Sequence, residues 1–138
     1  MGTLSRVFVA NRGEIAVRII EACHAEGIEA VLGVSEADRE GRGTDLADRI
    51  VCIGPAAAQA SYLNSDALIM AAKGTGCDAL HPGYGFLAEN AGLAGACGEN
   101  DILFVGPRPE TIEQLGDKLA ARRVAAEAGV PLMPGSEA

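Results

Sequence analysis

Aromatic residues are scarce in this sequence, and tryptophan is absent. Phe and Tyr together make up 4% of the 138 residues, whereas hydrophobic types make up 49%. A chain of this composition can bury a core, but the core must consist mainly of Ala, Val, Ile and Leu. The length is that of one ordinary domain.

Basic residues are few as well. The 11 Lys and Arg residues against 19 Asp and Glu give a formal net charge of −8. This acidic balance argues against nucleic acid or an anionic membrane surface as the main partner. It does not exclude a nucleotide, because one local basic group can bind phosphate on an acidic protein.

Long apolar runs are also lacking, so the sequence predicts neither a membrane-spanning helix nor an N-terminal signal peptide. The cysteines Cys23, Cys52, Cys77 and Cys97 form no C-x-x-C pair. We expect reduced, core-packed thiols in a cytoplasmic protein. A zinc site is not expected, because Cys23 and His24 are neighbours on a predicted helix and point in different directions.

Strand-like and helix-like patterns alternate along the chain. Strands are predicted at 6–10, 29–34, 49–53, 78–80 and 102–105. Helices are predicted at 14–26, at 66–73 with Ser65 as N-cap, at 88–99, 110–115 and 117–128, with a single helical turn at 46–48. Strands separated by helices in this way predict a doubly wound α/β fold with a parallel five-stranded sheet. In such sheets, ligands bind beyond the carboxyl ends of the strands.

The loop after the fourth predicted strand, His81–Leu87, has an unusual composition: His-Pro-Gly-Tyr-Gly-Phe-Leu. Pro82 fixes its own φ, and the two glycines allow backbone conformations that other residues resist. One interpretation is a tight connection with a buried Phe-Leu pair. The other is backbone shaped to approach a ligand closely, with Tyr84 in direct contact. We expect His81 itself to be a hydrogen-bonded structural residue, although an imidazole there could move protons.

Two predicted helix starts carry basic residues. At the first, we expect Asn11 to cap the helix and Arg12 to form an internal ion pair; the alternative is that Arg12 binds a phosphate or carboxylate. At the second, Asp117 suits an N-cap. Lys118 is then either a solvated surface lysine or a phosphate contact.

Other motifs that would name a reaction are absent. No G-x-G-x-x-G follows the first strand, and there is no Walker A loop or Ser/His/Asp signature. The charged run Asp38-Arg39-Glu40 is expected to be solvated and self-paired. From these residues alone, the sequence predicts an α/β domain with a functional edge and no named reaction.

Several motifs, in order and spacing, nevertheless resemble the opening of the biotin carboxylase family. The resemblance covers nearly the whole chain. It rests on Ala10–Ile20, Ser35–Arg39, Leu46–Asp48, Ile53–Pro55, Ser61–Asn64, His81–Leu87 with Glu89-Asn90, Phe104–Pro107 and Gly116–Lys118.

The resemblance implies a function. Members of this family use ATP, Mg²⁺ and bicarbonate to form carboxyphosphate and then carboxylate biotin on a carrier protein, and a carboxyltransferase uses the product. It implies that Lys118 contacts the ATP phosphates. It further implies that the loop containing His81, Gly83 and Gly85 forms one wall of the active site, with Tyr84 near biotin.

The resemblance also implies a domain division. Residues 1–107 resemble the family's N-terminal domain, and residues 108–138 resemble the start of its ATP-grasp region. The lid, the metal-binding carboxylates and the bicarbonate site lie further along in this family, and phosphoryl transfer needs such parts. We therefore expect the 138-residue chain to be catalytically incomplete and to act with the remainder of the ATP-grasp region.

Some positions depart from the family pattern. Glu21 stands where an arginine is typical, Arg49 where a glutamate follows Leu-Ala-Asp, and Ala88 where a serine is common. The Glu21 position supports a dimer contact in the bacterial enzyme, so that contact is not expected here. Two alternatives stay open: another ATP-grasp ligase, such as a carbamoyl-phosphate synthetase relative, or a free-standing nucleotide-binding or interaction domain.

Overall fold

The computed structural model describes residues 4–133 and forms an α/β fold. Residues 1–3 and 134–138, at the outer ends of the two predicted domains, lie outside the described part. The strands are β1 (Arg6–Val9), β2 (Glu29–Ser35), β3 (Arg49–Gly54), β4 (Ala79–His81) and β5 (Leu103–Phe104). The helices are α1 (Gly13–Ala25), α2 (Arg42–Leu46), α3 (Ser65–Gly74), α4 (Ala91–Glu99), α5 (Pro109–Gly116) and α6 (Lys118–Glu127), with 3₁₀ turns at Glu36–Asp38 and Ala58–Ala60.

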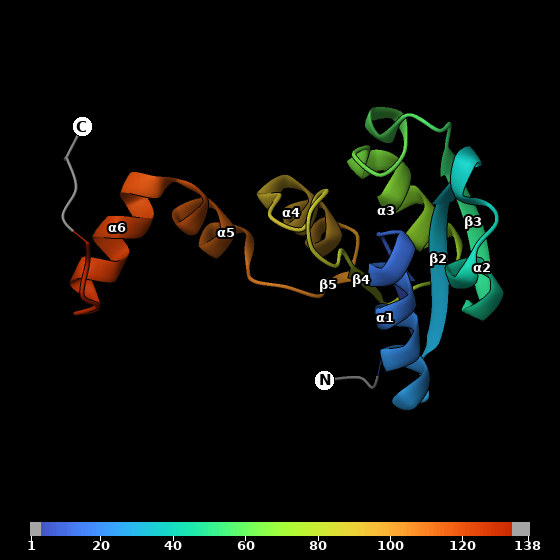
Figure 1. Cartoon of the computed structure of the whole chain (residues 1–138). Helices are drawn as coiled ribbons and strands as arrows, with labels where there is room; N and C mark the ends of the chain where they lie inside the picture. The colour runs from blue at the N-terminus through green and yellow to red at the C-terminus, as the bar shows by residue number, and fades with distance from the viewer. Residues whose placement is uncertain (1–3, 134–138) are drawn as a thin grey trace.

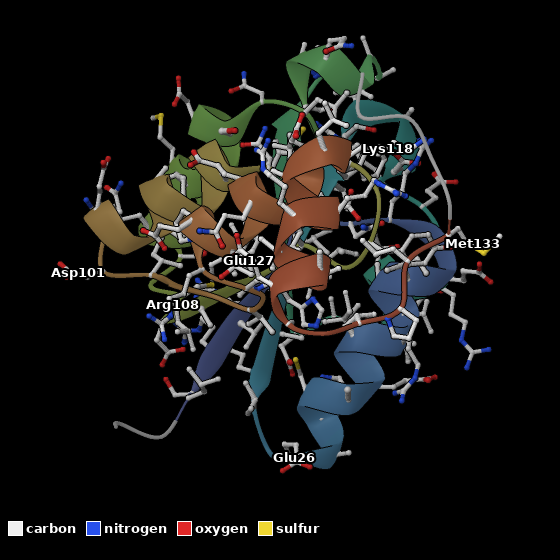
Figure 2. The ribbon with its side chains drawn as sticks, turned by 90° about the vertical axis from the view of Figure 1, so that its left-hand side faces the viewer. Glu26, Asp101, Arg108, Lys118, Glu127 and Met133 are labelled. Atoms are coloured by element: carbon white, nitrogen blue, oxygen red, sulfur yellow. The ribbon has the colours of Figure 1, made fainter. Side chains whose placement is uncertain are left out.

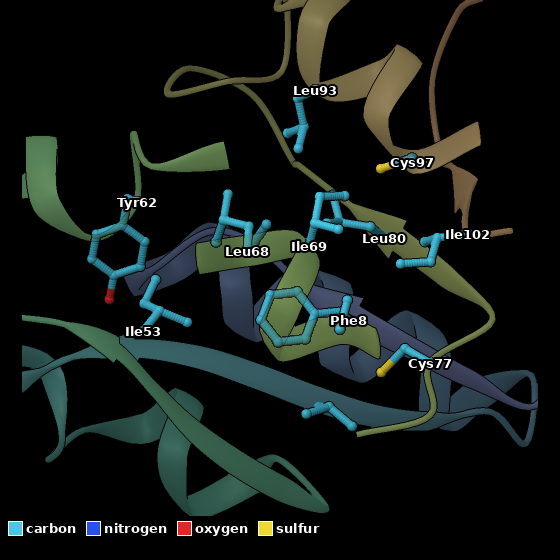
Figure 3. Close-up of a cluster of buried hydrophobic side chains, with 13 residues drawn as sticks. Phe8, Ile53, Tyr62, Leu68, Ile69, Cys77, Leu80, Leu93, Cys97 and Ile102 are labelled. Carbon is cyan, nitrogen blue, oxygen red and sulfur yellow. The ribbon is translucent and has the colours of Figure 1, made fainter. Parts of the chain in front are cut away.

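The five strands form one parallel sheet in the order β3-β2-β1-β4-β5 (Figure 1). This confirms the predicted doubly wound fold. Alternate side chains of the strands face opposite sides of the sheet, and each side has its own core. Val7 and Val9 belong to the core beneath α1. Phe8 and Val31 belong to the other, which α3 and α4 cover (Figure 3).

Two helix starts differ from the prediction. The N-cap of α3 is Asn64, whose side chain accepts a hydrogen bond from the Ala67 amide, so Ser65 lies inside the helix. Helix α4 begins at Ala91 because the Asn90 side chain caps it by accepting from the Leu93 amide. Asparagine competes well with serine as an N-cap, which explains both shifts.

The helical turn predicted at 46–48 is also misplaced. Helix α2 covers Arg42–Leu46 and begins within the glycine-rich linker. Gly43 lies against Leu32, and a Cβ at this position would be only 3.2 Å from the Leu32 side chain. Close packing of a short helix on the sheet, and not a local cap, therefore sets its position.

Helices α5 and α6 extend from the α4 side of the sheet (Figure 1). Ile112 is the buried residue of α5, and no residue of α6 is buried. The chain from α5 onward exposes several apolar side chains: Leu115, Leu119, Val124, Val130, Leu132 and Met133. Within residues 4–133, no helix is both long and apolar enough to cross a bilayer.

Candidate functional site

The candidate site lies where the strand order reverses. β1 has β2 on one side and β4 on the other, so the chain leaves β1 and β4 toward opposite faces of the sheet. The connections that follow the two strands therefore separate at their carboxyl ends, which is the usual place for a ligand in a doubly wound sheet. The residues there are Ala10–Arg12 after β1 and the loop His81–Leu87 after β4, called below the 81–87 loop.

Asn11 joins these two connections. Its side-chain Nδ2 donates to the carbonyl oxygens of Pro82 at 2.8 Å and Tyr84 at 2.9 Å, and the side chain is buried. Asn11 was predicted to cap α1, but it does not. Arg12 occupies the N-cap position, and its side chain makes no capping hydrogen bond. No local pattern in the sequence indicates this role, because the partners are more than 70 residues away.

The 81–87 loop has a strongly curved backbone. Gly83 and Gly85 have φ values of +67° and +69°, and Phe86 has a φ of +41°. Glycine adopts this region freely, but a bulky residue such as Phe does so only when its surroundings hold it there. The Tyr84 side chain projects from the loop, with 68% of its surface exposed. Phe86 and Leu87, by contrast, are partly buried and pack against the core that α3 and α4 cover, as the first interpretation expects.

His81 stabilises the start of this loop. Its Nδ1 accepts a hydrogen bond from the Gly83 amide at 3.0 Å, which matches the predicted structural role. Burial lowers the pKa of His81 below its ordinary value. Both observations favour the neutral imidazole, since a protonated Nδ1 has no lone pair to accept with.

A polar network centred on Asp38 lies beside the 81–87 loop. Asp38 Oδ2 accepts hydrogen bonds from the Ser35 hydroxyl at 2.6 Å and the Tyr62 hydroxyl at 3.0 Å. It also forms an ion pair with Arg12 at 3.4 Å, so the predicted internal ion pair of Arg12 is confirmed. The guanidinium of Arg12 lies 5.7 Å from the ring centroids of both Tyr62 and Phe86. The network thereby connects the ends of β1 and β2 with the 81–87 loop.

Asp38 corrects another expectation. The Asp38-Arg39-Glu40 run was predicted to be solvated and self-paired, yet Asp38 turns inward to Ser35 and Tyr62. Partial burial alone would raise the pKa of Asp38, but these hydrogen bonds and the charge of Arg12 outweigh it and keep the pKa below its ordinary value. One signal was available in the sequence: a tyrosine in an apolar setting needs a hydrogen-bond partner.

An open cavity of about 740 Å³ adjoins this network. It lies between the first turns of α1, the end of β2 and the linker at 40–44, and Arg12 and Asp38 border it. The 81–87 loop does not line it. Among residues 4–133, no three His, Cys, Asp or Glu side chains are grouped so that they could hold a metal ion.

Lys118 lies apart from these residues. It is the first residue of α6 (Figure 2). Asp117 caps this helix by accepting from the Ala120 amide at 2.7 Å, as predicted. The Lys118 side chain is exposed and forms no ion pair with the described residues. The structure thus brings His81, Gly83, Tyr84 and Gly85 together on one loop, with Lys118 on a separate helix.

Comparison with known proteins gives the family of this chain. Residues 3–112 match the family described as "Biotin carboxylase, N-terminal domain". The chain belongs to this family. It is 51% identical, over 134 residues, to biotin carboxylase 1 of Bacillus subtilis (strain 168). That alignment covers 97% of this chain and 30% of the relative.

Solved structures of biotin carboxylase domains have the same fold as this chain. The chain superposes on the biotin carboxylase domain of thermophilic 2-oxoglutarate carboxylase bound to bicarbonate with a TM-score of 0.94 and 42% identity, covering 99% of this chain and 31% of the other. The biotin carboxylase domain dimer of the Hydrogenobacter thermophilus 2-oxoglutarate carboxylase, in complex with MgADP, ADP and bicarbonate, matches with a TM-score of 0.91 and 41% identity. This second match covers 99% of this chain and 30% of the other. The chain therefore spans about a third of the length of these proteins.

Proposed function

We propose that this chain is the N-terminal part of a biotin carboxylase, an ATP-dependent ligase that carboxylates carrier-bound biotin with bicarbonate. The observation that carries the proposal is the family match over residues 3–112. The biotin carboxylase relatives and solved domains, 41 to 51% identical over nearly the whole chain, support it further. They favour this function over the two alternatives, another ATP-grasp ligase and a free-standing binding domain.

The proposal divides the chain at about residue 107. Residues 1–107 form the N-terminal domain, and residues 108–138 begin the ATP-grasp region. The exposed apolar side chains of α5 and α6 support this division, because such surface normally packs against further protein. The 138-residue chain alone is then inactive, since phosphoryl transfer also needs metal clamps and a positioned nucleophile.

Two residues of this chain are assigned to ligands. Lys118 binds ATP phosphates; its side chain is exposed and forms no ion pair with residues 4–133, which supports this role. Tyr84 lies near biotin, and its exposure on the 81–87 loop, with His81, Gly83 and Gly85 beside it, supports that role. Mg²⁺ would supply charge neutralisation on the ATP phosphates. The partners of the whole protein are a biotin carboxyl carrier protein or domain and a carboxyltransferase.

The first experiment is an immunoblot of the source cells with antibody raised to this chain. A band several times the 14.1 kDa of the chain supports the carboxylase. A band at that mass would contradict it and favour a binding domain. The protein purified with this antibody should transfer radiolabelled bicarbonate to biotin only when ATP is present, and avidin should abolish the transfer.

The two lysines of the chain provide a matched pair for the ATP assignment. In the full-length protein, Lys118→Gln should raise the KM for ATP roughly tenfold or more, because a charge-assisted phosphate contact is lost. Lys73→Gln is the control, since Lys73 lies on the surface of α3 and donates to Asn100. Equal KM values for the two variants would remove Lys118 from the site.

A further inference from the structure

One side chain of the described residues, Asn11, makes the side-chain hydrogen bonds that join the 81–87 loop to the end of β1. The amide of Asn11 spans from the end of β1 to the two carbonyls that flank the Gly83-Tyr84 pair, at 2.8 and 2.9 Å. With 4% of its surface exposed, Asn11 is one of three buried polar residues among those that the structure describes. A buried amide kept in an apolar interior needs all its hydrogen bonds.

Those hydrogen bonds are complete. Both N–H groups of the Asn11 amide donate to the loop, and its Oδ1 accepts from the Arg12 amide at 2.9 Å. No other side chain of this size offers two donors and an acceptor in one plane. Aspartate has the same shape, but its carboxylate would face two carbonyl oxygens without a proton to share.

The loop is shaped to admit this amide. A Cβ on Gly83 would lie 2.7 Å from Asn11 Nδ2 and 2.7 Å from the Ile15 side chain, which is closer than real Cβ atoms come. Gly85 has nearly the same φ but nothing within 4 Å of its Cβ position. Gly83 is therefore required both for its backbone angle and for the approach of Asn11, whereas Gly85 is required only for its angle.

We propose that Asn11 is a positioning residue for Tyr84. By fixing the carbonyls on both sides of the Gly83-Tyr84 pair, it sets the direction in which the exposed Tyr84 ring meets its ligand. This inference rests on the proposed function for the identity of that ligand, biotin. Asn11 itself is only 4% exposed, and its amide nitrogen is engaged by the loop carbonyls, so we assign it a positioning role and no direct contact with biotin.

The test compares Asn11→Ala and Asn11→Asp in the full-length protein. Both should raise the KM for free biotin roughly tenfold, because the ring of Tyr84 is no longer held in the orientation that meets biotin. The KM for ATP and the ATP hydrolysis measured without biotin should stay unchanged. Asn11→Asp retains the side-chain volume, so a loss of packing does not explain its effect.

Asn64→Ala is the matched control. It removes another asparagine whose side chain bonds to backbone, the N-cap of α3, but leaves the 81–87 loop intact. It should leave the KM for biotin within about twofold of the wild type. Equal KM values for biotin in the wild type and both Asn11 variants would overturn the proposal, as would a parallel rise in the KM for ATP.

A second measurement separates this inference from the proposed function. In the 138-residue chain, hydrogen exchange of the Gly83 and Ala88 amides, which are bonded within the loop, should accelerate at least tenfold in Asn11→Asp and stay unchanged in Asn64→Ala. If Tyr84→Ala leaves the KM for biotin unchanged, the assignment of biotin to Tyr84 fails. Unchanged exchange in Asn11→Asp would instead refute the role of Asn11.

Discussion

The rings of Tyr62 and Phe86 stack with their centroids 5.0 Å apart and their planes 10° from parallel. Tyr62 belongs to the connection between β3 and α3, whereas Phe86 belongs to the 81–87 loop. The stack gives the strained backbone of Phe86 a partner, and Arg12 lies over both rings. Three connections that are far apart in the sequence are thus joined behind Tyr84.

The bond between Tyr62 and Asp38 should be measurable by a double-mutant cycle. Asp38→Ala leaves the hydroxyls of Tyr62 and the buried Ser35 without an acceptor, so we expect a loss of about 1–3 kcal/mol in the free energy of unfolding. Tyr62→Phe should cost about 1 kcal/mol. The double variant should lose less than the sum, as residues in one network do. Urea unfolding followed by circular dichroism provides the values, and strict additivity would contradict the network.

The two glycines of the 81–87 loop should respond differently to the same substitution. Gly85→Ala should cost about 1–2 kcal/mol, which is the penalty for a Cβ at positive φ. Gly83→Ala has the same penalty and in addition forces Asn11 and Ile15 apart, so it should cost clearly more. Thermal unfolding of both variants checks the order. Equal losses would mean that Asn11 does not approach Gly83 as described.

The stability of the fold should fall with acidification through the histidine range. Burial lowers the pKa of His81 in the folded state from the ordinary value of 6.5, so the unfolded chain takes up this proton first. The contribution of neutral His81 is therefore complete above pH 6.5 and is lost as the pH falls toward the folded-state pKa. The pKa values of Asp38, Asp48 and Asp78 are also lowered in the folded state. The stability that these carboxylates contribute is lost only at lower pH, below their ordinary pKa of 3.8.

His81→Asn removes this titration and keeps an acceptor for the Gly83 amide. We expect the free energy of unfolding of the wild type to drop more between pH 7.5 and 5.5 than that of the variant. The other histidine, His24, is present in both proteins and so cancels in the comparison. Urea denaturation at a series of pH values provides the comparison. Parallel curves would show that His81 is not protonated more easily on unfolding.

One thiol should react far faster than the others. Cys52 was predicted to be core-packed but is exposed on β3, where a backbone hydrogen bond at Gly54 and the guanidinium of Arg39 lower its pKa. Cys23, Cys77 and Cys97 are buried, and burial raises the pKa of Cys97 to about 11. A thiol reagent at pH 7.5 should modify one cysteine per folded chain and all four in urea. Cys52→Ser should abolish the fast phase, and a remaining fast phase would contradict the burial of the other three.

Apolar periodicity was enough to predict the sheet and its helices. Val7–Ala10 is a short apolar run typical of a buried strand, and the helix after it has Ile19 and Cys23 at helical spacing. Helix starts were less predictable, because adjacent cap residues compete: Asn64 outcompeted Ser65. The choice between two neighbouring caps depends on the backbone that precedes them, which local sequence does not specify.

The sequence by itself determined the parallel α/β fold, since apolar strands alternate with helical patterns, and the family, since its motifs occur in the family's order and spacing. Only the tertiary structure decided that Asn11 binds the loop and does not cap α1, and that Asp38 faces Tyr62 and not solvent. The physical reason is that a buried polar group takes whichever partner the strand order brings near it. That partner is set by how β1, β2 and β4 lie side by side, and not by neighbours in the chain.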